Sequence, residues 1–176
     1  MFNIVLYEPE IPPNTGNIIR LCVNTSSKLH LIKPLGFDLN EKQVRRAGLD
    51  YHDMANISIH ETYNDCLEKL KGNRFFAVTT KATKYYGDFE YIKGDVFVFG
   101  PETRGLPLGI LNKMLENEKI RVPMVKNNRS LNLSNTVAIV LYEAWRQINF
   151  ESGIKSSGFI DRPKRSNTAS FGDFPS

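Results

Sequence analysis

DVFVFGPETRGLP, residues 95–107, carries the clearest signature of fold class in this chain. Its four apolar residues, Val96–Phe99, form a short run typical of a fully buried strand. Glycines at positions 100 and 105 allow the backbone to approach a ligand closely or to adopt a positive φ. A helix is expected after Pro107, so the stretch predicts the strand, loop and helix from which α/β domains are built.

The glycine loop does not have the spacing of the common nucleotide-binding motifs. Neither G-x-G-x-x-G nor the P-loop pattern fits it, so a Rossmann dinucleotide site and an NTPase site are disfavoured. A simpler alternative is a tight connection that carries an exposed ion pair. We favour a ligand-binding loop, because a plain connection does not need two glycines around a Glu-Thr-Arg triplet. A bulky residue in place of Gly100 is therefore expected to obstruct the ligand.

Strand and helix patterns alternate over most of the chain. This order predicts an α/β domain with a mostly parallel sheet covered by helices on both faces. The expected strands are Phe2–Tyr7, Leu29–Lys33, Ile57–Ile59, Phe75–Thr80, Val96–Phe99 and Lys119–Pro123. The expected helices are Asn17–Ser26, Glu41–Ala47, Glu61–Leu70, Leu108–Leu115 and Asn135–Ile148. In such sheets a ligand site lies outside the carboxyl ends of the strands.

A second unusual loop, EPEIPPNTGNIIRLCVN at residues 8–24, follows the first expected strand. A tandem proline favours an extended backbone there, and Asn14 or Thr15 could cap the following helix. One face of this helix is polar and sets Arg20 among Asn and Gly residues, so it is either solvated or a clamp for phosphate or ribose. The opposite, apolar face comprises Ile18, Ile19, Leu21, Cys22 and Val23.

A third loop precedes the last helix within KIRVPMVKNNRSLNLSNTVAIVLYEAWRQI, residues 119–148. We expect the helix to be capped near Ser134 or Asn135. Capping uses only one or two of the polar side chains there, which leaves others for ligand contacts. Residues 137–142 are apolar almost all round the helix, which predicts deep burial or a subunit interface, and hence a homodimer.

Basic and aromatic residues are adjacent in QVRRAGLDYH, residues 43–52. Arg45 and Arg46 near Tyr51 and His52 suit RNA, where phosphate contact and base stacking combine. An amphipathic helix end whose arginines complement the helix dipole explains the same residues equally well. The net charge of +4 is compatible with a polyanionic partner but is weak support by itself.

Other classes of protein are disfavoured. The cysteines and histidines have no metal-ligand spacing, so no metal is expected; they are Cys22, Cys66, His30, His52 and His60. The first ten residues lack the basic region of a signal peptide, and no apolar run is long enough to span a bilayer. We therefore expect a cytoplasmic protein. Residues 150–176 have neither helical nor strand periodicity. They are predicted to form an extended or flexible polar tail with basic Arg162, Lys164 and Arg165.

The three loops together resemble the signature motifs of the SPOUT superfamily of RNA methyltransferases. The matching stretches are NTGNIIRLC, FVFGPETRGLP and IRVPM…RSLNLSNTVAIVLYEA. Three motifs in the same order make the resemblance specific, and it covers Met1 to about Asn149. Further similarity lies in NIVLYEPEIPPNTGNIIRLC, RRAGLDYH and NLSNTVAIVLYEAWRQ, which look like the branch that methylates the wobble nucleotide of tRNA.

The resemblance implies a fold, a cofactor and site residues. It implies one domain, residues 1–149, whose C-terminal part forms a trefoil knot that holds S-adenosylmethionine. Arg20 matches the catalytic arginine of the family, and Tyr142 matches a tyrosine important for activity on tRNA. Pairing through the first and last helices is implied for the homodimer. The positions that match cofactor contacts are Val78, Thr79, Gly100, Glu102, Val122, Ser130 and Leu131. Arg45, Arg46 and Arg129 are the expected RNA contacts.

The implied reaction is transfer of a methyl group to the ribose 2′-hydroxyl of a wobble cytidine or modified uridine. It needs no metal and no covalent intermediate, so positioning and oxyanion stabilisation are the tasks of the protein. A guanidinium is a poor general base because it stays protonated, so Arg20 is expected to act by electrostatics. The alternatives are methylation of another tRNA or rRNA nucleotide, and an RNA-binding module without catalysis.

Overall fold

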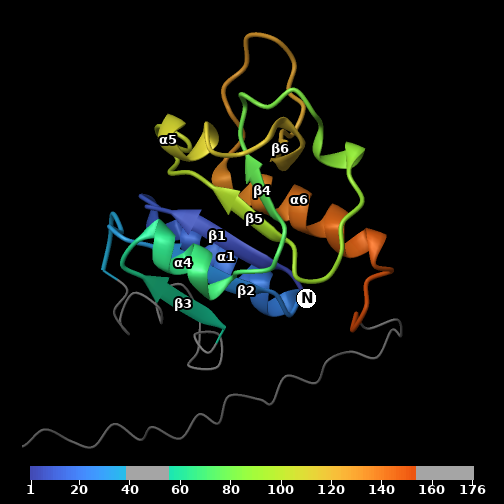
Figure 1. Ribbon diagram of the computed structural model, residues 1–176, viewed down its shortest axis with the longest axis horizontal. Coiled ribbons are helices and arrows are strands. Elements are labelled where there is room, and N and C mark those ends of the chain that lie inside the picture. Colours follow the sequence, from blue (N-terminus) through green and yellow to red (C-terminus); the bar gives the residue numbers. More distant parts are fainter. Residues whose placement is uncertain (39–55, 154–176) are drawn as a thin grey trace, which may run out of the picture.

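The computed structural model describes residues 1–38 and 56–153, which form a six-stranded parallel sheet with helices on both faces (Figure 1). The strand order is β3-β2-β1-β5-β4-β6, and every neighbouring pair is parallel. The strands are β1 (Asn3–Tyr7), β2 (Lys28–Ile32), β3 (Ile57–His60), β4 (Phe75–Val78), β5 (Val96–Phe99) and β6 (Lys119–Ile120). The expected fold class and all six expected strands are confirmed, with ends that shift by at most three residues.

In the described residues, two helices cover each face of the sheet. The helices are α1 (Pro12–Asn24), α4 (Tyr63–Lys69), α5 (Leu108–Leu111) and α6 (Leu133–Gln147), with short 3-10 turns η1 (Tyr86–Asp88) and η2 (Glu116–Glu118). Helices α1 and α6 pack on one face, and α4 and α5 pack on the other (Figure 1). The helix expected at residues 41–47 lies outside the described residues.

The central strands are buried on both faces. In β1, Ile4 and Leu6 join the core under α1 and α6, while Val5 points to the α4 side. In β5, Phe97 faces α1 and α6, while Val98 faces α4 and α5. This double burial explains why both strands are continuously apolar in sequence.

Helix α1 starts earlier than the sequence suggested. It begins at Pro12 with Ile11 as N-cap, and no side chain caps it. A proline fits the first turn of a helix because its missing N–H would have no partner there. The expectation that Asn14 or Thr15 caps the helix is therefore wrong, since both lie inside it and are buried. The expected apolar face is confirmed, with Ile18, Ile19 and Cys22 buried.

Helix α6 also starts before the expected cap. Its N-cap is Asn132, whose side-chain oxygen accepts hydrogen bonds from the backbone N–H groups of Ser134 and Asn135. The cap therefore lies two residues before Ser134, near the expected position. The apolar segment behaves as expected, because Val140 and Leu141 are fully buried, whereas the Tyr142 side chain is 43% exposed.

The packed part of the chain continues past Asn149. The indole N–H of Trp145 donates to the carbonyl of Glu151 (3.0 Å), and the ring of Phe150 packs edge-to-face on Trp145. The Glu151 carboxylate pairs with Lys93. These contacts extend two residues past the expected boundary at residue 149, while residues 154–176 lie outside the described part. In residues 1–38 and 56–153, no helix is long and apolar enough to cross a membrane.

Candidate active site

A cavity of about 480 Å³ opens at the carboxyl ends of β4, β5 and β6. Because these three strands are neighbours in the sheet, the segments that follow them converge at one edge. The walls come from residues 78–80, 99–106 and 130–133, with Val122, Met124 and Thr136 beside them. Ile11 and Asn14, at the start of α1, complete the lining. The volume falls in the range of roughly 300–1,000 Å³ that is usual for small-molecule sites.

The residues that the sequence resemblance assigned to the cofactor converge on this cavity. All of them are in its lining, namely Val78, Thr79, Gly100, Glu102, Val122, Ser130 and Leu131. They come from three loops that are far apart in sequence, which the sheet order brings together. The walls combine apolar side chains with hydroxyl groups, a carboxylate and the backbone of the glycine loop.

The carboxylate of Glu102 joins the glycine loop to the start of α1. It accepts hydrogen bonds from the backbone N–H groups of Glu10 (2.9 Å) and Ile11 (3.3 Å) and from the side-chain amide of Asn14 (2.9 Å). A carboxylate at a helix N-terminus is also stabilised by the helix dipole. Glu102 therefore holds the loop against α1 as well as lining the cavity.

A chain of amide side chains extends this junction to α6. The side-chain amide of Asn132 donates to the side-chain oxygen of Asn14 (2.8 Å), while the oxygen of Asn132 caps α6. Asn14 thus uses its oxygen toward Asn132 and its nitrogen toward Glu102. Sequence reasoning treated Asn14 only as a possible cap. Its position four residues before Ile18, on the buried face of α1, is the signal that could have shown its role.

Arg104, in the wall of the cavity, forms two ion pairs at the protein surface. Its guanidinium pairs with the carboxylates of Glu8 (2.5 Å) and Glu10 (2.8 Å), and its side chain is 55% exposed. The hydroxyl of Thr103 donates to Glu10 at 2.7 Å. That hydrogen bond lowers the pKa of Glu10, and the charge of Arg104 acts in the same direction. The exposed ion pair considered as an alternative to a ligand loop is therefore present, and it coexists with the cavity.

Of the two loop glycines, Gly105 has the expected positive φ, while Gly100 has a reason that the sequence did not show. A Cβ on Gly100 would lie 2.2 Å from the carbonyl carbon of Gly105 and 2.2 Å from the nitrogen of Leu106. Gly105 has a φ of +66°. A side chain at residue 100 would therefore collide with the loop's own backbone. That it would also obstruct a ligand stays a prediction.

Arg20 and Tyr142 lie away from the cavity of their own chain. Neither is in its lining, which among the described residues reaches Asn14 on α1 and Thr136 on α6. Each lies six residues further along its helix, which corresponds to a distance of about 9 Å. Arg20 is exposed, and the Tyr142 ring packs edge-to-face on Trp145. Of the expected RNA contacts, Arg129 is exposed next to the cavity-lining Ser130, while Arg45 and Arg46 lie outside the described residues.

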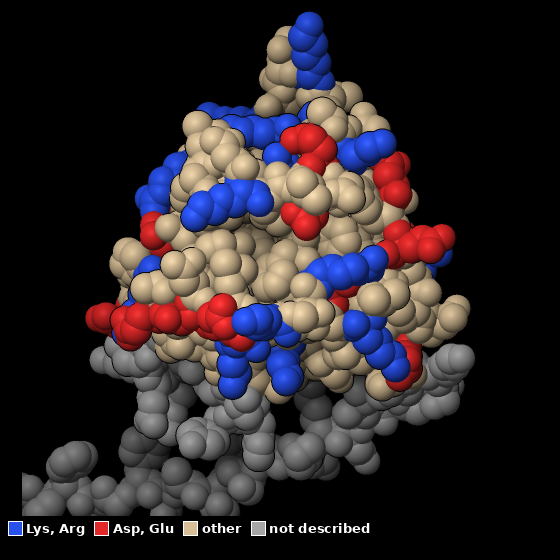
Figure 2. All heavy atoms as spheres, in the orientation of Figure 1, with Lys and Arg blue, Asp and Glu red and all other residues tan. Residues whose placement is uncertain are grey.

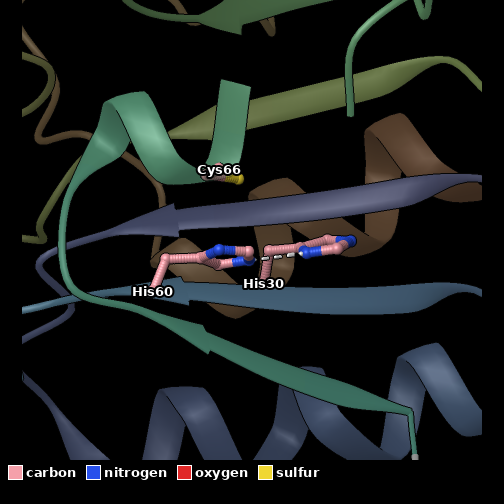
Figure 3. Close-up of side chains that lie close together, drawn as sticks. All are labelled: His30, His60 and Cys66. Atoms are coloured by element: carbon pink, nitrogen blue, oxygen red, sulfur yellow. Dashed lines mark hydrogen bonds between the residues drawn. The ribbon is translucent and has the colours of Figure 1, made fainter. Parts of the chain in front are cut away.

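Three metal-ligating groups come together elsewhere, which their sequence spacing did not predict. His30 of β2, His60 of β3 and Cys66 of α4 have their ligand atoms within 4.8 Å of one another (Figure 3). His30 Nδ1 and His60 Nε2 share a hydrogen bond of 3.0 Å, and His30 Nε2 lies 3.4 Å from the side-chain oxygen of Asn3.

Hydrogen bonding fixes the protonation of this cluster. The Asn3 amide nitrogen donates to the carbonyl of Gly94, so its oxygen must accept from His30 Nε2. The lone pair of His30 Nδ1 is then used by the His60 N–H. Burial lowers the pKa of His30 to about 4 and raises the pKa of the Cys66 thiol to about 12. The contacts suit a neutral structural cluster, and the absence of a bound metal stays a prediction.

Comparison with known proteins agrees with the geometry. The chain matches the SpoU rRNA Methylase family over residues 1–142. A tRNA (cytidine(34)-2′-O)-methyltransferase of Methylovorus glucosotrophus is 58% identical over 154 residues, which cover 88% of this chain and 100% of the relative. A protein of the same name from Escherichia coli K12 is 54% identical, with 88% and 98% of the two chains covered.

Solved structures extend the similarity to the fold. A crystal structure of a putative RNA methyltransferase from Bacillus anthracis has a TM-score of 0.82 at 43% identity, covering 89% of this chain and all of the other. A structure described as giving insight into 2-OH methylation of C/U34 on tRNA has a TM-score of 0.78 at 39% identity, covering 85% and 97%. The family match over most of the chain, the near full-length relatives and the shared fold lead to one conclusion: the chain belongs to the SpoU methylase family.

Proposed function

We propose that this protein methylates the ribose 2′-hydroxyl of the wobble nucleotide of tRNA, cytidine or modified uridine at position 34, with S-adenosylmethionine as the methyl donor. The observation that carries the proposal is the near full-length identity of 54–58% to proteins named for this reaction. The cavity adds physical support, because the three loops that carry the sequence resemblance build it together.

The cavity suits this cofactor in size and chemistry. Its volume of about 480 Å³ accommodates a ligand with a purine, a ribose and an amino-acid moiety. Phe99, Val122 and Leu131 supply apolar surface for a ring, and the backbone of residues 100–106 supplies donors and acceptors for polar edges. The residues that would hold the cofactor are the lining residues in the segments that follow β4, β5 and β6.

When bound, the sulfonium group of S-adenosylmethionine supplies an electrophilic methyl group. The chain's own residues then have two tasks, to orient the groups and to stabilise the oxyanion that develops at the ribose. The hydrogen bonds from Asn14 to Glu102 and from Asn132 to Asn14 keep the glycine loop and the start of α6 at a fixed separation. Arg20 is the residue assigned to the oxyanion and to a neighbouring phosphate.

The location of Arg20 supports a homodimer within this proposal. Arg20 and Tyr142 lie on the helices that cover one face of the sheet, about 9 Å beyond the residues that reach the cavity. A second copy that packs through α1 and α6 would bring an exposed Arg20 toward the cavity of its partner. The 43% exposure of Tyr142 leaves part of α6 available for such a contact.

Further expectations belong to the same proposal. The protein acts in the cytoplasm, needs no metal, and contacts tRNA through Arg129 together with Arg45 and Arg46. The resemblance also implies that the C-terminal part is threaded as a trefoil knot. Residues 154–176 can add phosphate contacts through Arg162, Lys164 and Arg165.

The proposal is tested with purified protein, radiolabelled S-adenosylmethionine and two matched tRNAs. One carries cytidine at position 34, and the other carries 2′-deoxycytidine there and is otherwise identical. Methyl transfer to the first tRNA alone is the expected result. Equal transfer to both would show that another nucleotide is the target. Binding of tRNA with no cofactor binding by calorimetry would favour the non-catalytic RNA-binding module.

A further inference from the structure

A segment that follows β4 runs beside the residue that follows β6. The backbone N–H of Arg121 donates to the carbonyl of Lys84 (2.9 Å), and the N–H of Tyr86 donates to the carbonyl of Arg121 (3.0 Å). These bonds make a parallel bridge between Tyr85 and Arg121. Because the next residue along, Val122, lines the cavity, the bridge lies at the border of the site.

Tyr85 is an exposed aromatic ring on a fixed backbone. Its side chain is 50% exposed, while its own N–H donates to the Asp88 carboxylate (2.8 Å) and its carbonyl accepts from the Asp88 N–H (3.1 Å). Residues paired in a bridge project to the same side, so Tyr85 and Arg121 share one surface. A half-exposed aromatic ring on a backbone held by hydrogen bonds is a platform on which a nucleic-acid base can stack.

Several cations that lie close in sequence to the cavity wall form no ion pair within the described part of the chain. Among residues 1–38 and 56–153, ion pairs engage Lys33, Lys71, Arg74, Lys93, Arg104, Lys119 and Arg146. None of these pairs includes Lys81, Lys84, Arg121, Lys126 or Arg129, each of which lies close in sequence to a residue of the cavity wall.

Arg121 has, in the described part of the chain, one side-chain nitrogen without a hydrogen-bond partner. In the described part of the chain its Nε is buried and makes no hydrogen bond. Figure 2 shows Lys and Arg mixed with Asp and Glu on the face viewed, without a continuous basic band. Uncompensated guanidinium and ammonium groups beside a cavity are suited to phosphate oxygens.

We propose that Lys84, Tyr85 and Arg121 form an RNA-binding surface at the border of the cavity, with Tyr85 stacking on a base and the two cations contacting phosphates. This inference rests on the proposed function and adds where the RNA strand lies. Tyr85 is outside the cavity lining, so the base that stacks on it belongs to a neighbour of the methylated nucleotide. The strand crosses the cavity between this surface and Arg129.

The test compares Tyr85→Ala, Tyr85→Phe, Lys84→Ala and a control, Lys71→Ala, whose lysine pairs with Glu68 at the end of α4. Fluorescence anisotropy with a C34 tRNA gives Kd at several salt concentrations, and calorimetry gives the Kd for S-adenosylmethionine. Tyr85→Ala is expected to weaken tRNA binding by about five- to a hundredfold with an unchanged salt slope, because one stacked base is lost. Tyr85→Phe keeps the stacking surface and is expected to bind like wild type.

Lys84→Ala is expected to lower the slope of log K against log salt by about 0.7–0.9, the effect of one phosphate contact, while Lys71→Ala leaves it unchanged. All variants should keep wild-type cofactor affinity, which shows that they fold. The proposed RNA-binding surface would be contradicted if Tyr85→Ala bound tRNA with the wild-type Kd. It would also be contradicted if Lys84→Ala and Lys71→Ala had equal slopes of log K against log salt. Methylation of a nucleotide other than 34 by the wild type would contradict the proposed function and leave the surface standing.

Discussion

The side-chain amide of Asn132 donates a 2.8 Å hydrogen bond to the side-chain oxygen of Asn14, 118 residues earlier in the chain. Asn14 in turn donates to the Glu102 carboxylate at 2.9 Å. These two bonds tie the glycine loop, the first helix and the last helix together at the cavity. They give each asparagine only one acceptable orientation of its amide group.

Replacing Asn14 by aspartate should disrupt the hydrogen bond to Glu102 with little change in the size of the side chain. The introduced carboxylate would face the carboxylate of Glu102 in place of an N–H donor, which leaves two negative charges in contact. We expect a loss of about 2 kcal/mol in the free energy of unfolding, typical of a lost hydrogen bond to a charged group, together with weaker cofactor binding. Denaturant unfolding measures the first and calorimetry the second.

Two further variants make this prediction specific. Asn17→Asp changes an exposed residue of the same helix and should leave stability within about 0.5 kcal/mol of wild type. Adding Glu102→Gln to Asn14→Asp should restore part of the loss, because an amide donor then faces the new carboxylate. An additive double variant would show that Asn14 and Glu102 do not act as a pair.

Gly100→Ala should damage the loop itself. The new Cβ would lie 2.2 Å from backbone atoms of residues 105 and 106, so the loop must move. We expect a stability loss of about 1–3 kcal/mol, the usual cost of overpacking, and loss of cofactor binding. Gly109→Ala is the matched control, since a Cβ there meets nothing within 4 Å. If Gly100→Ala is as stable as Gly109→Ala, the crowding at residue 100 has no energetic weight.

Arg20→Ala should abolish methyl transfer while leaving cofactor affinity unchanged, because Arg20 is not in the lining of its own chain's cavity. Arg20→Lys keeps the charge but loses the planar fork that holds two oxygens, so it should also be severely impaired. Single-turnover methylation and calorimetry separate the two effects. Near-normal methylation by the alanine variant would remove Arg20 from the mechanism.

Stability should fall as the pH drops from about 6.5 to about 4. Burial, followed by the charges of His60, Lys28 and Lys69, lowers the pKa of His30 to about 4, whereas an unfolded histidine titrates near 6.5. Within that window the unfolded chain takes up a proton that the folded chain does not, so protonation favours unfolding. The stability present above pH 6.5 is lost progressively toward pH 4, by an amount on the order of 3 kcal/mol at most.

His30→Gln removes this titrating group and should flatten the dependence of the unfolding free energy on pH between 6.5 and 4. His60 faces the same cluster; burial lowers its pKa, and Asp65 acts against that shift. Some slope from His60 should therefore remain in the variant. Equal slopes in wild type and His30→Gln would show that His30 does not supply the pH dependence.

The sequence was informative where local chemistry decides the structure. The apolar runs of β1 and β5 identified buried strands, because residues on both faces of a central parallel strand must be apolar. The site was predictable through the family resemblance, because the residues that match cofactor contacts all line one cavity. The start of α1 was misjudged because a proline and a buried Asn14 have more than one local explanation.

Contacts that depend on tertiary packing could not be read in this way. His30, His60 and Cys66 meet because β2, β3 and α4 pack together, and no spacing between them encodes that contact. The bond between Asn14 and Asn132 depends on α1 and α6 covering the same face of the sheet.

Mapping of 2′-O-methyl groups in tRNA from cells that lack this protein tests the proposed function most directly. The account predicts that the methyl group at nucleotide 34 is lost while other ribose methylations remain. It also predicts that the wild-type protein restores this methyl group and that the Arg20→Ala variant does not. A fully methylated nucleotide 34 in the deleted cells, with loss at another position, would contradict the proposed function.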